Sequence, residues 1–311
     1  MKKFATIALT LAMAAASACA SATTVGICQL VQHEALDAAT QGFKDALTEK
    51  MPDVKFDEQN AAGDAATCVT ITSKFAADGV DLILANATSP LQAAVSATGD
   101  IPILGTSITD YATALGMKEW NGTTGINVSG TSDLAPLDGQ ASMIQELFPE
   151  AKNIGLLYCS AEANSVYQIT TIKGYLEEMG YTCTEFAFTD SNDVASVTQS
   201  AADSSDVVYI PTDNTAAAYT ETIANVLIPA KVPAVVGEEG ICKGCGVATL
   251  TISYYDIGYK TGEMAYEILV NGANPAEMPI EYAPQFTAKY NPTMCEALGL
   301  TAPDGYEAVT E

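Results

Sequence analysis

The chain has 311 residues, of which 48% are hydrophobic and 16% are charged. This length and composition suit two ordinary folded domains and exclude a disordered chain. The formal net charge is −25, and all 13 basic residues are lysine. A polyanion would be repelled by such a chain, so nucleic acid is excluded as a natural partner, and the acidity is interpreted as a solubility feature.

The N-terminus predicts a secretory signal peptide over residues 1–22. Two lysines precede a short apolar stretch at residues 4–16, and the Ala-Ser-Ala triplet at residues 20–22 fits a cleavage site. The stretch is too short to span a membrane, so we expect a mature chain that begins near Thr23 and is released into the periplasm or another extracytoplasmic space. A lipid anchor at Cys19 is the alternative, because the residues before it form a weak lipoprotein motif.

The first half of the mature chain alternates predicted strands with predicted helices. A strand at residues 24–31 precedes a helix at 34–50, in which apolar side chains recur on one face. Further strands are expected at residues 54–57, 81–85 and 101–105, and further helices at 67–77 and 89–98. This alternation is typical of a doubly wound parallel sheet.

The second half repeats this order. The segments at residues 153–158, 206–210 and 232–237 match those at 24–29, 81–85 and 101–105, each at nearly the same offset. A strand at 247–252, a helix at 255–270 and a short helix at 294–298 follow. Two copies of one architecture are the favoured interpretation, and chance similarity between α/β segments is the alternative.

Three extended segments, around residues 132, 252 and 283, are predicted to join the two halves as hinges. The expected fold class is therefore α/β, with two Rossmann-like doubly wound lobes joined by three hinge segments. Residues 23–131 plus 253–282 would form lobe 1, and residues 132–252 plus 283–311 would form lobe 2. Closure about a hinge over a ligand is a known switch in such folds.

Seven short motifs occur in order along the chain: Val25–Asp37, Asn60–Asp64, Asn86–Ser89, Tyr158–Ser165, Asn192–Ser196, Tyr209–Thr215 and Ala248–Gly258. Together, from about Thr24 to Leu300, they resemble the ABC-transporter substrate-binding proteins of the tryptophan/tyrosine uptake type. The resemblance implies a type I periplasmic-binding-protein fold that captures a small zwitterion, favouring an aromatic or other apolar amino acid, for a membrane permease. A monomer is expected.

Polar side chains follow the predicted strands, where an open α/β sheet binds its ligands. An amino acid needs donors for its carboxylate and acceptors for its ammonium group. Because the chain has no arginine, a guanidinium clamp is excluded, and hydroxyl groups and helix N-termini must take its place. For the carboxylate we expect Thr88 and Ser89 first, with Ser160, Asn164 and Ser165 from the other lobe. For the ammonium group we expect Asp213 first and Glu238 second.

Further residues are expected around this site: Gln29, His33 and Glu34 after the first strand, Ser107 and Asp110 after the fourth, Asn214 beside Asp213, and Tyr254 as an aromatic wall. Aromatic and apolar side chains form most of a small-molecule pocket. For the polar residues the alternative is an ordinary helix cap or a solvated surface group, and for Tyr254 it is packing.

Other classes of function fit the sequence less well. One histidine, no G-x-S-x-G motif and no phosphate-binding glycine loop leave no catalytic residues to propose, and no metal or cofactor is expected. A sugar- or nucleoside-binding protein of the same fold, or a ligand-binding sensor component, is the alternative. The Cys242-Lys-Gly-Cys245 motif is interpreted as a local disulfide or two idle thiols, and the pairing of the seven mature cysteines is not readable from their spacing.

Overall fold

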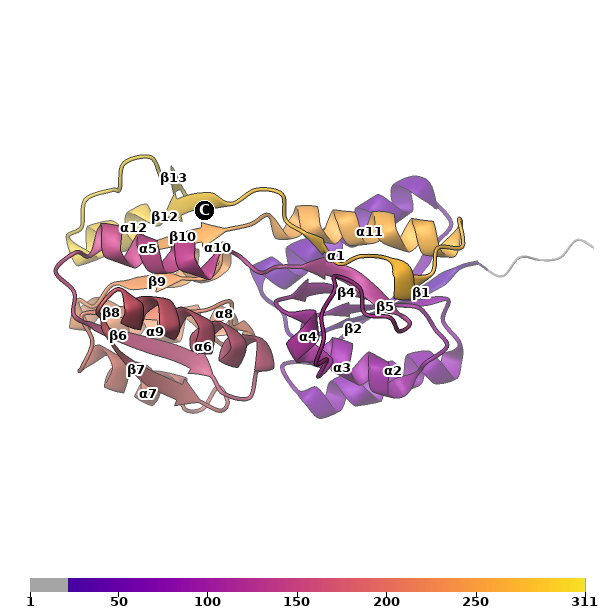
Figure 1. The fold of residues 1–311 in the computed structure, drawn as a ribbon, viewed down its shortest axis with the longest axis horizontal. Helices are drawn as coiled ribbons and strands as arrows, with labels where there is room; N and C mark the ends of the chain where they lie inside the picture. The colour runs from indigo at the N-terminus through magenta and orange to yellow at the C-terminus, as the bar shows by residue number, and fades with distance from the viewer. Residues whose placement is uncertain (1–21, 311) are drawn as a thin grey trace, which may run out of the picture.

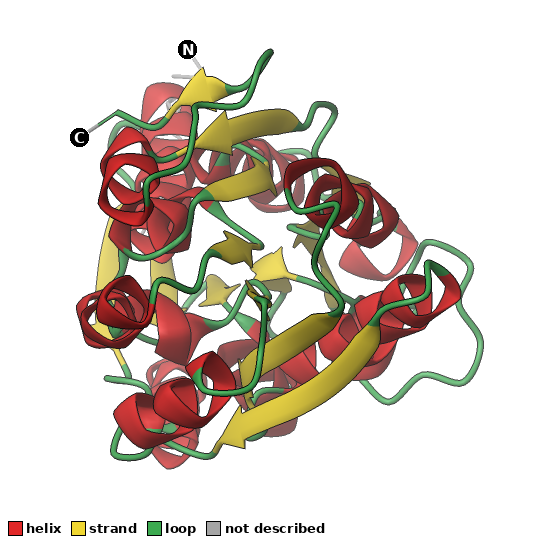
Figure 2. Ribbon diagram, turned by 90° about the vertical axis from the view of Figure 1, so that its left-hand side faces the viewer, coloured by secondary structure: helices red, strands yellow, loops and turns green. Residues whose placement is uncertain are grey.

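The computed structural model describes residues 22–310, which form two α/β lobes lying side by side (Figure 1). Cys19 and all but the last residue of the expected signal peptide lie outside the described residues. Between residues 22 and 310, no helix combines the length and the apolar character needed to cross a membrane. Seen from the end of the second lobe, helices lie on both sides of the strands (Figure 2).

Lobe 1 is built on a six-stranded parallel sheet in the order β11-β5-β4-β3-β1-β2. Its strands are β1 (Thr24–Gln29), β2 (Lys55–Asn60), β3 (Leu82–Asn86), β4 (Ile103–Ile108), β5 (Val128–Ser132) and β11 (Glu281–Tyr282). Its helices are α1 (Glu34–Lys50), α2 (Ala65–Asp78), α3 (Thr88–Ala97), α4 (Tyr111–Ala114) and α11 (Tyr254–Leu269).

The inner strands of lobe 1 (β1, β3, β4 and β5) are buried, which explains the apolar runs of β1 and β3, whereas the edge strands β2 and β11 are more exposed. Successive side chains of β3 alternate: Leu82 and Leu84 pack under α1 and α11, whereas Ile83 and Ala85 pack under α2 and α3. Glycines let α1 and α11 approach closely. A Cβ atom on Gly258 would lie 2.0 Å from the carbonyl oxygen of Ala39.

Lobe 2 is built on a seven-stranded sheet in the order β13-β12-β10-β9-β8-β6-β7. Its strands are β6 (Asn153–Cys159), β7 (Thr182–Phe188), β8 (Val207–Ile210), β9 (Ala234–Val236), β10 (Ala248–Thr251), β12 (Thr287–Tyr290) and β13 (Glu307–Ala308). Its helices are α5 (Leu137–Leu147), α6 (Ala163–Glu178), α7 (Val194–Ala202), α8 (Asn214–Ala218), α9 (Thr220–Ala230), α10 (Glu239–Gly244) and α12 (Pro292–Leu298). Only the pair of β10 with β12 is antiparallel among the described strands of this sheet.

The chain passes between the two sheets three times: after β5, after β10 and after β11. These passages lie at the three extended segments of the sequence, and a short 3₁₀ helix, η1 (Pro275–Glu277), precedes the last one. The two-lobed α/β fold predicted from the sequence is confirmed. The division into domains at residues 131, 252 and 282 stays a prediction about which parts move together.

Candidate ligand-binding site

A small cavity lies between the carboxyl ends of the two sheets, where the lobes face each other. Seven of the residues expected at the site line it: His33, Ser107, Asn164, Asp213, Asn214, Glu238 and Tyr254. Leu36, Thr109, Asp133, Thr212 and Ala217 complete the lining. The placement follows the general rule that parallel sheets bind ligands beyond their carboxyl ends.

Ser107 sits at a strained point of the cavity wall. Its φ is +56°, in the left-handed region that side chains other than glycine rarely occupy, and the register of β4 against β5 shifts between Gly105 and Ile108. The hydroxyl of Ser107 is buried and has no hydrogen-bond partner among the described residues. Strain of this kind concentrates at functional sites, and here it places an unpaired polar group at the cavity.

Asp133 carries a second unpaired atom of the cavity. It follows β5 directly and is 4% exposed, and its Oδ2 accepts a hydrogen bond from the hydroxyl of Tyr254 at 2.9 Å. Its Oδ1 is buried without a partner among the described residues. Burial raises the pKa of this carboxyl group above its usual range. An unpaired buried carboxylate oxygen is costly, so Asp133 offers a strong acceptor to a ligand.

Asp133 was not among the residues predicted from the sequence. The residue lies in a segment that was interpreted only as a hinge, although it follows a strand just as Asp213 does. The same rule that selected polar groups after the other strands would have found it, if β5 had been assigned to the sheet.

Asp213 is committed to contacts within lobe 2. Its Oδ1 accepts the N–H of Ala216 at 2.8 Å and caps α8, and its Oδ2 accepts the N–H of Cys159 and the hydroxyl of Ser165, both at 2.7 Å. Burial, with the nearby charge of Glu162, raises its pKa to about 7. Asp213 therefore fixes the loops after β6 and β8, and Ser165 supports it.

Glu238 also acts as a helix cap. Its carboxylate accepts the N–H groups of Gly240, at 2.6 Å, and of Ile241, at the start of α10. Burial raises its pKa to about 7. Glu238 borders the cavity, but both of its oxygens already have partners, which matches the capping alternative of the sequence analysis.

Glu162, which the sequence analysis did not select, orients the next part of the wall. Its carboxylate accepts the backbone and side-chain N–H groups of Asn214 at 3.0 and 2.7 Å and the hydroxyl of Thr215 at 2.8 Å. With its amide nitrogen held in this way, Asn214 points its Oδ1 to Nε2 of His33 in lobe 1 at 3.2 Å. Burial lowers the pKa of His33, so the neutral ring is favoured here.

Away from the hinge segments, two pairs of described side chains connect the lobes across the cleft. His33 and Asn214 meet inside it, and Glu34 of α1 forms an ion pair with Lys243 of α10 at its rim. Glu34 therefore contacts the other lobe, although its half-exposed side chain does not line the cavity. These contacts show that the lobes are closed on each other.

The structure does not bring the remaining predicted residues to the cavity. Gln29 is held inside lobe 1, where its side chain bonds to Asp37 at 2.6 Å and to Thr40 at 2.7 Å. Asp110 caps α4 by accepting the N–H of Thr113 at 2.7 Å. Ser160 is exposed and donates to the carbonyl oxygen of Phe188 at 3.2 Å.

Thr88 and Ser89 also lie away from the cavity lining. Both fall in the first turn of α3, and Thr88 is buried. Ser89 lines an outer cleft between the lobes, together with Val31, Glu162 and Tyr219. Asn214 belongs to both linings, so the outer cleft adjoins the cavity.

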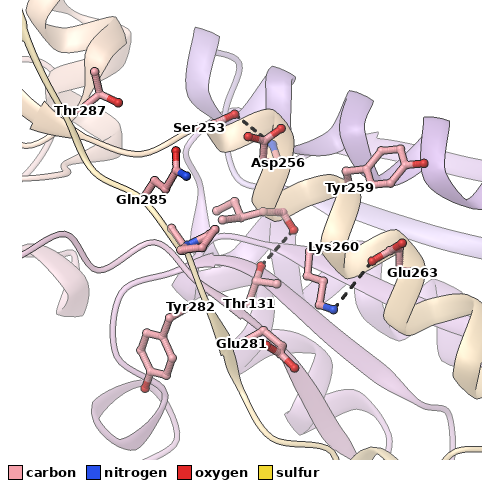
Figure 3. Close-up of a pocket in the computed structure, with 13 residues that line it drawn as sticks. Thr131, Ser253, Asp256, Tyr259, Lys260, Glu263, Glu281, Tyr282, Gln285 and Thr287 are labelled. Atoms are coloured by element: carbon pink, nitrogen blue, oxygen red, sulfur yellow. Dashed lines mark hydrogen bonds and ion pairs between the residues drawn. The ribbon is translucent and has the colours of Figure 1, made fainter.

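A larger groove of 690 Å³ lies beside the hinge segments, between α11 and residues 281–287 (Figure 3). Some of its polar side chains have partners: Lys260 pairs with Glu263 at 3.8 Å, and the hydroxyl of Ser253 accepts the N–H of Asp256 at 3.2 Å. None of the unpaired buried side-chain atoms of residues 22–310 belongs to its lining, whereas two belong to the cavity between the lobes. The cavity measures only about 10 Å³ with the lobes closed, so size favours the groove. The unpaired polar atoms lie at the cavity, however, and we take the cavity together with the adjoining outer cleft of 370 Å³ as the site.

A family model described as "ABC transporter substrate binding protein" matches residues 24–309. The chain belongs to this family. Its members are the extracytoplasmic substrate-binding components of ABC transporters, so this protein binds a substrate for such a transporter.

Three known proteins are similar to this family member over most of its length. A curated tyrosine-binding protein of Clostridioides difficile (strain R20291) is 37% identical over 260 residues, which are 82% of this chain and 75% of that protein. A solved ABC domain in complex with L-Trp from Streptococcus pneumoniae is 32% identical, with a TM-score of 0.88, over 93% of this chain and 100% of that chain.

The third is the ligand-free, open structure of a substrate-binding protein with adhesive properties from Clostridium difficile. It is 37% identical over 92% of this chain and 99% of that chain, and its TM-score is 0.70. The present structure is thus nearer in shape to the L-Trp complex than to the open structure, although its sequence is nearer to the latter. The contacts between the lobes agree with the greater similarity in shape to the L-Trp complex.

Proposed function

We propose that this protein captures a free amino acid with an aromatic side chain between its lobes and delivers it unchanged to the permease of an ABC importer. The observation that carries the proposal is the unpaired carboxylate oxygen of Asp133 in a cavity that also holds the unpaired hydroxyl of Ser107. A ligand that supplies both a cationic donor and an acceptor would satisfy these two atoms at once.

The α-ammonium group is the donor that we assign to Asp133. A charged N–H group bonded to a buried carboxylate is among the stronger hydrogen bonds in proteins. The α-carboxylate is assigned to the hydroxyl of Ser107, because the neutral ring of His33 already directs its one N–H group to Oδ1 of Asn214. The cavity lining contains no lysine, and the chain has no arginine, so neutral donors must bind this carboxylate.

The aromatic side chain is assigned to the outer cleft beside the cavity. Leu30, Val31 and Tyr219 give that cleft apolar surface from both lobes. The tyrosine-binding relative and the L-Trp complex support an aromatic amino acid over other apolar ones.

Closure of the lobes would retain the ligand. We propose that residues 23–131 with 253–282 and residues 132–252 with 283–311 move as two bodies about the three connecting segments. The His33–Asn214 and Glu34–Lys243 contacts support this motion, because each pair joins the two bodies and must separate when the cleft opens.

A sugar- or nucleoside-binding function has less support. Such ligands are commonly held by stacked aromatic rings, and Trp120, the chain's one tryptophan, is stacked against Tyr111 in lobe 1 with ring centroids 6.5 Å apart. It belongs to the packing of lobe 1 and does not line the cavity. Nothing in the described residues favours a sensor component over a transporter component.

Calorimetry with matched ligands tests the proposal. L-Tyr, L-Trp and L-Phe should bind, whereas N-acetyl-L-tyrosine, which has no ammonium group, and tyramine, which has no carboxylate, should bind at least tenfold more weakly (about 1.4 kcal/mol). Binding of a sugar or nucleoside, with no response to aromatic amino acids, would overturn it. Recovery of the bound amino acid unchanged would support the absence of catalysis.

We also propose that the protein is exported through a cleaved signal peptide and acts as a monomer. Mass spectrometry of the exported chain should give an N-terminus near Thr23, whereas a lipid-modified N-terminus at Cys19 would favour the anchored form. Light scattering coupled to size-exclusion chromatography should give the mass of one chain, and a dimer mass would contradict the monomer.

A further inference from the structure

Glu162 is a buried acid to which the proposed ligand contacts assign no part. It is the N-cap residue of α6 and is only 6% exposed. Its carboxylate accepts five hydrogen bonds of 2.7–3.2 Å, from the N–H and Nδ2 of Asn214, the N–H and hydroxyl of Thr215, and Nδ2 of Asn164. Among residues 22–310 it forms no ion pair. A buried carboxylate without a cation is costly, which indicates a role beyond filling the wall.

Capping of a helix does not by itself account for this acid. α8 already has a cap, because Asp213 accepts the N–H of Ala216 at 2.8 Å. Burial raises the pKa of Asp213, and the charge of Glu162 raises it further, so the two acids oppose each other. What Glu162 adds, beyond two more N–H groups of α8, is the bond to the side-chain amide of Asn214.

The carboxylate fixes the direction in which the amide of Asn214 faces. A carboxylate only accepts hydrogen bonds, so Nδ2 of Asn214 must face Glu162 and Oδ1 must face away from it. Oδ1 meets Nε2 of His33, across the cleft, at 3.2 Å. Because an amide oxygen only accepts, the ring nitrogen must carry the proton. The bond therefore runs in one direction, from His33 of lobe 1 to Asn214 of lobe 2.

The ring of His33 has no described hydrogen-bond partner in its own lobe. His33 is the N-cap residue of α1, but its side chain forms no hydrogen bond with that helix. Burial lowers its pKa, so the ring is neutral and carries one proton. His33 and Asn214 both line the cavity, and Asn214 also lines the outer cleft. The bond between them thus lies where the two parts of the proposed binding site adjoin.

We propose that Glu162 is a positioning residue for ligand retention: it holds the amide of Asn214 so that His33 closes on lobe 2 as the Nε2–H tautomer. The inference rests on the proposed function, in which the ligand is held between the lobes. Both oxygens of Glu162 are occupied, so it acts through Asn214 rather than by binding the ligand. The bond to His33 must break before the lobes open, so its loss should speed the release of the ligand.

Nuclear magnetic resonance of the ring tests the direction of the bond. His33 is the chain's only histidine, so ¹⁵N-labelled histidine gives the signals of a single ring. In the natural protein at neutral pH, a slowly exchanging proton should be observed on Nε2, because the ring is partly buried and donates to Asn214. Spectra are recorded with and without saturating L-Trp. A proton on Nδ1, or no observable ring N–H in either sample, would overturn the proposal.

Glu162→Gln changes the polarity of the side chain and keeps its shape. Whichever way the new amide faces, one of its N–H groups opposes a donor of Asn214 or Thr215, so the five donors can no longer all be satisfied. The Nε2 proton signal should disappear or move to Nδ1. Glu178→Gln, an exposed acid at the other end of α6, is the control and should keep the signal on Nε2. An unchanged signal in Glu162→Gln would refute the role of this residue.

Dissociation kinetics give a second readout, which a merely structural role would not reproduce. Glu162→Gln should speed the release of L-Tyr or L-Trp about tenfold. His33→Ala should have a similar effect, and the double variant should be no faster than either single variant, because both changes remove the same bond. Effects that multiply in the double variant would show that Glu162 does not act through His33.

Failure of the proposed function would give a different pattern of results. If the natural protein binds none of L-Tyr, L-Trp and L-Phe, capture of an aromatic amino acid is wrong. The ring spectrum of the protein without ligand then still decides whether Glu162 sets the direction of the bond between the lobes.

Discussion

Asp133 and Tyr254 form the part of the site where one unpaired atom is available to a ligand. Asp133 follows β5 and Tyr254 begins α11, so they belong to two different connections between the lobes. The hydroxyl of Tyr254 donates to one carboxylate oxygen of Asp133, and the other oxygen has no partner among the described residues. The sites for Asp213 and Glu238 look similar in sequence, but backbone N–H groups already occupy their oxygens. All three acids are buried, so burial does not distinguish them. Asp133 differs from the helix caps Asp213 and Glu238 because one of its oxygens is unpaired.

Asp133→Asn should weaken binding of an aromatic amino acid by about 10- to 100-fold, because it removes a charged acceptor for the ammonium group. The shape of the side chain and its acceptor for Tyr254 are kept, so the Tm of the ligand-free protein should change little. Calorimetry against L-Tyr and L-Trp measures the effect. Asp138→Asn, at an exposed acid of α5, is the control and should bind as the natural protein does.

Glu238 should make stability depend on pH. Its folded pKa is about 7, above the ordinary value of 4.5, so the folded state holds a proton that the unfolded state releases. Its contribution is fully present below about pH 4.5 and is lost as the pH rises through 7. Denaturation of Glu238→Gln between pH 5 and pH 8 should therefore show a smaller fall in the free energy of unfolding than the natural protein. An equal fall in both proteins would remove Glu238 as a cause.

At the scale of elements, the packing of α1 on α11 connects the fold of lobe 1 to the site. Their close approach depends on Gly42 and Gly258, whose missing side chains would overlap backbone atoms of the other helix. The first residue of α11 is Tyr254, the partner of Asp133. The position of this helix therefore sets the position of a cavity wall.

Gly258→Ala should destabilise the protein by about 1–3 kcal/mol, because the two helices must separate to admit a methyl group. Chemical denaturation measures the free energy of unfolding. Gly174→Ala is a suitable comparison: it lies within α6 with no atom near the added methyl group, and it should be stabilising by up to about 1 kcal/mol. Equal effects of the two changes would argue against the packing explanation.

Much of this level could be predicted from the sequence. The bounds expected for α1 agree with the structure, and those for α2, α3 and α11 differ by one or two residues at each end. The break between α8 and α9 at Tyr219 could not be predicted in this way, because a local helical pattern does not report a change in helix direction.

Considered as a whole molecule, the protein has two lobes that polar side-chain pairs join across the cleft. Lys243 contributes one of them, and it also lies 3.7 Å from Glu239, so reversal of its charge would place three acids together. The exposed Glu34–Lys243 ion pair contributes little to the free energy of closure. Repulsion between three acids at the same place would oppose closure of the lobes.

Lys243→Glu should shift the ligand-free protein toward a more open shape, which small-angle X-ray scattering would detect as a larger radius of gyration. Lys173→Glu changes the net charge equally but disrupts the Lys173–Glu185 pair inside lobe 2, so it should leave the radius unchanged. The same radius for both variants would mean that Lys243 does not hold the lobes together.

The two-lobed architecture was predictable because strands and helices alternate and the order repeats. His33, Ser107, Asp213 and Asn214 were predicted at the site because each follows a strand, and all four line one cavity in the structure. What could not be predicted is which polar groups remain unpaired there. Asp213 and Asp133 each follow a strand, and their different roles depend on partners, such as Cys159 and Tyr254, that are distant in the chain.

The two ends of the chain belong to different lobes, since β1 lies in the sheet of lobe 1 and β13 in that of lobe 2. Fluorescent proteins fused to the two termini would therefore sit on separate moving bodies. Energy transfer between them would change when the cleft closes, so the protein could serve as an optical reporter of free amino acid without any insertion into its fold.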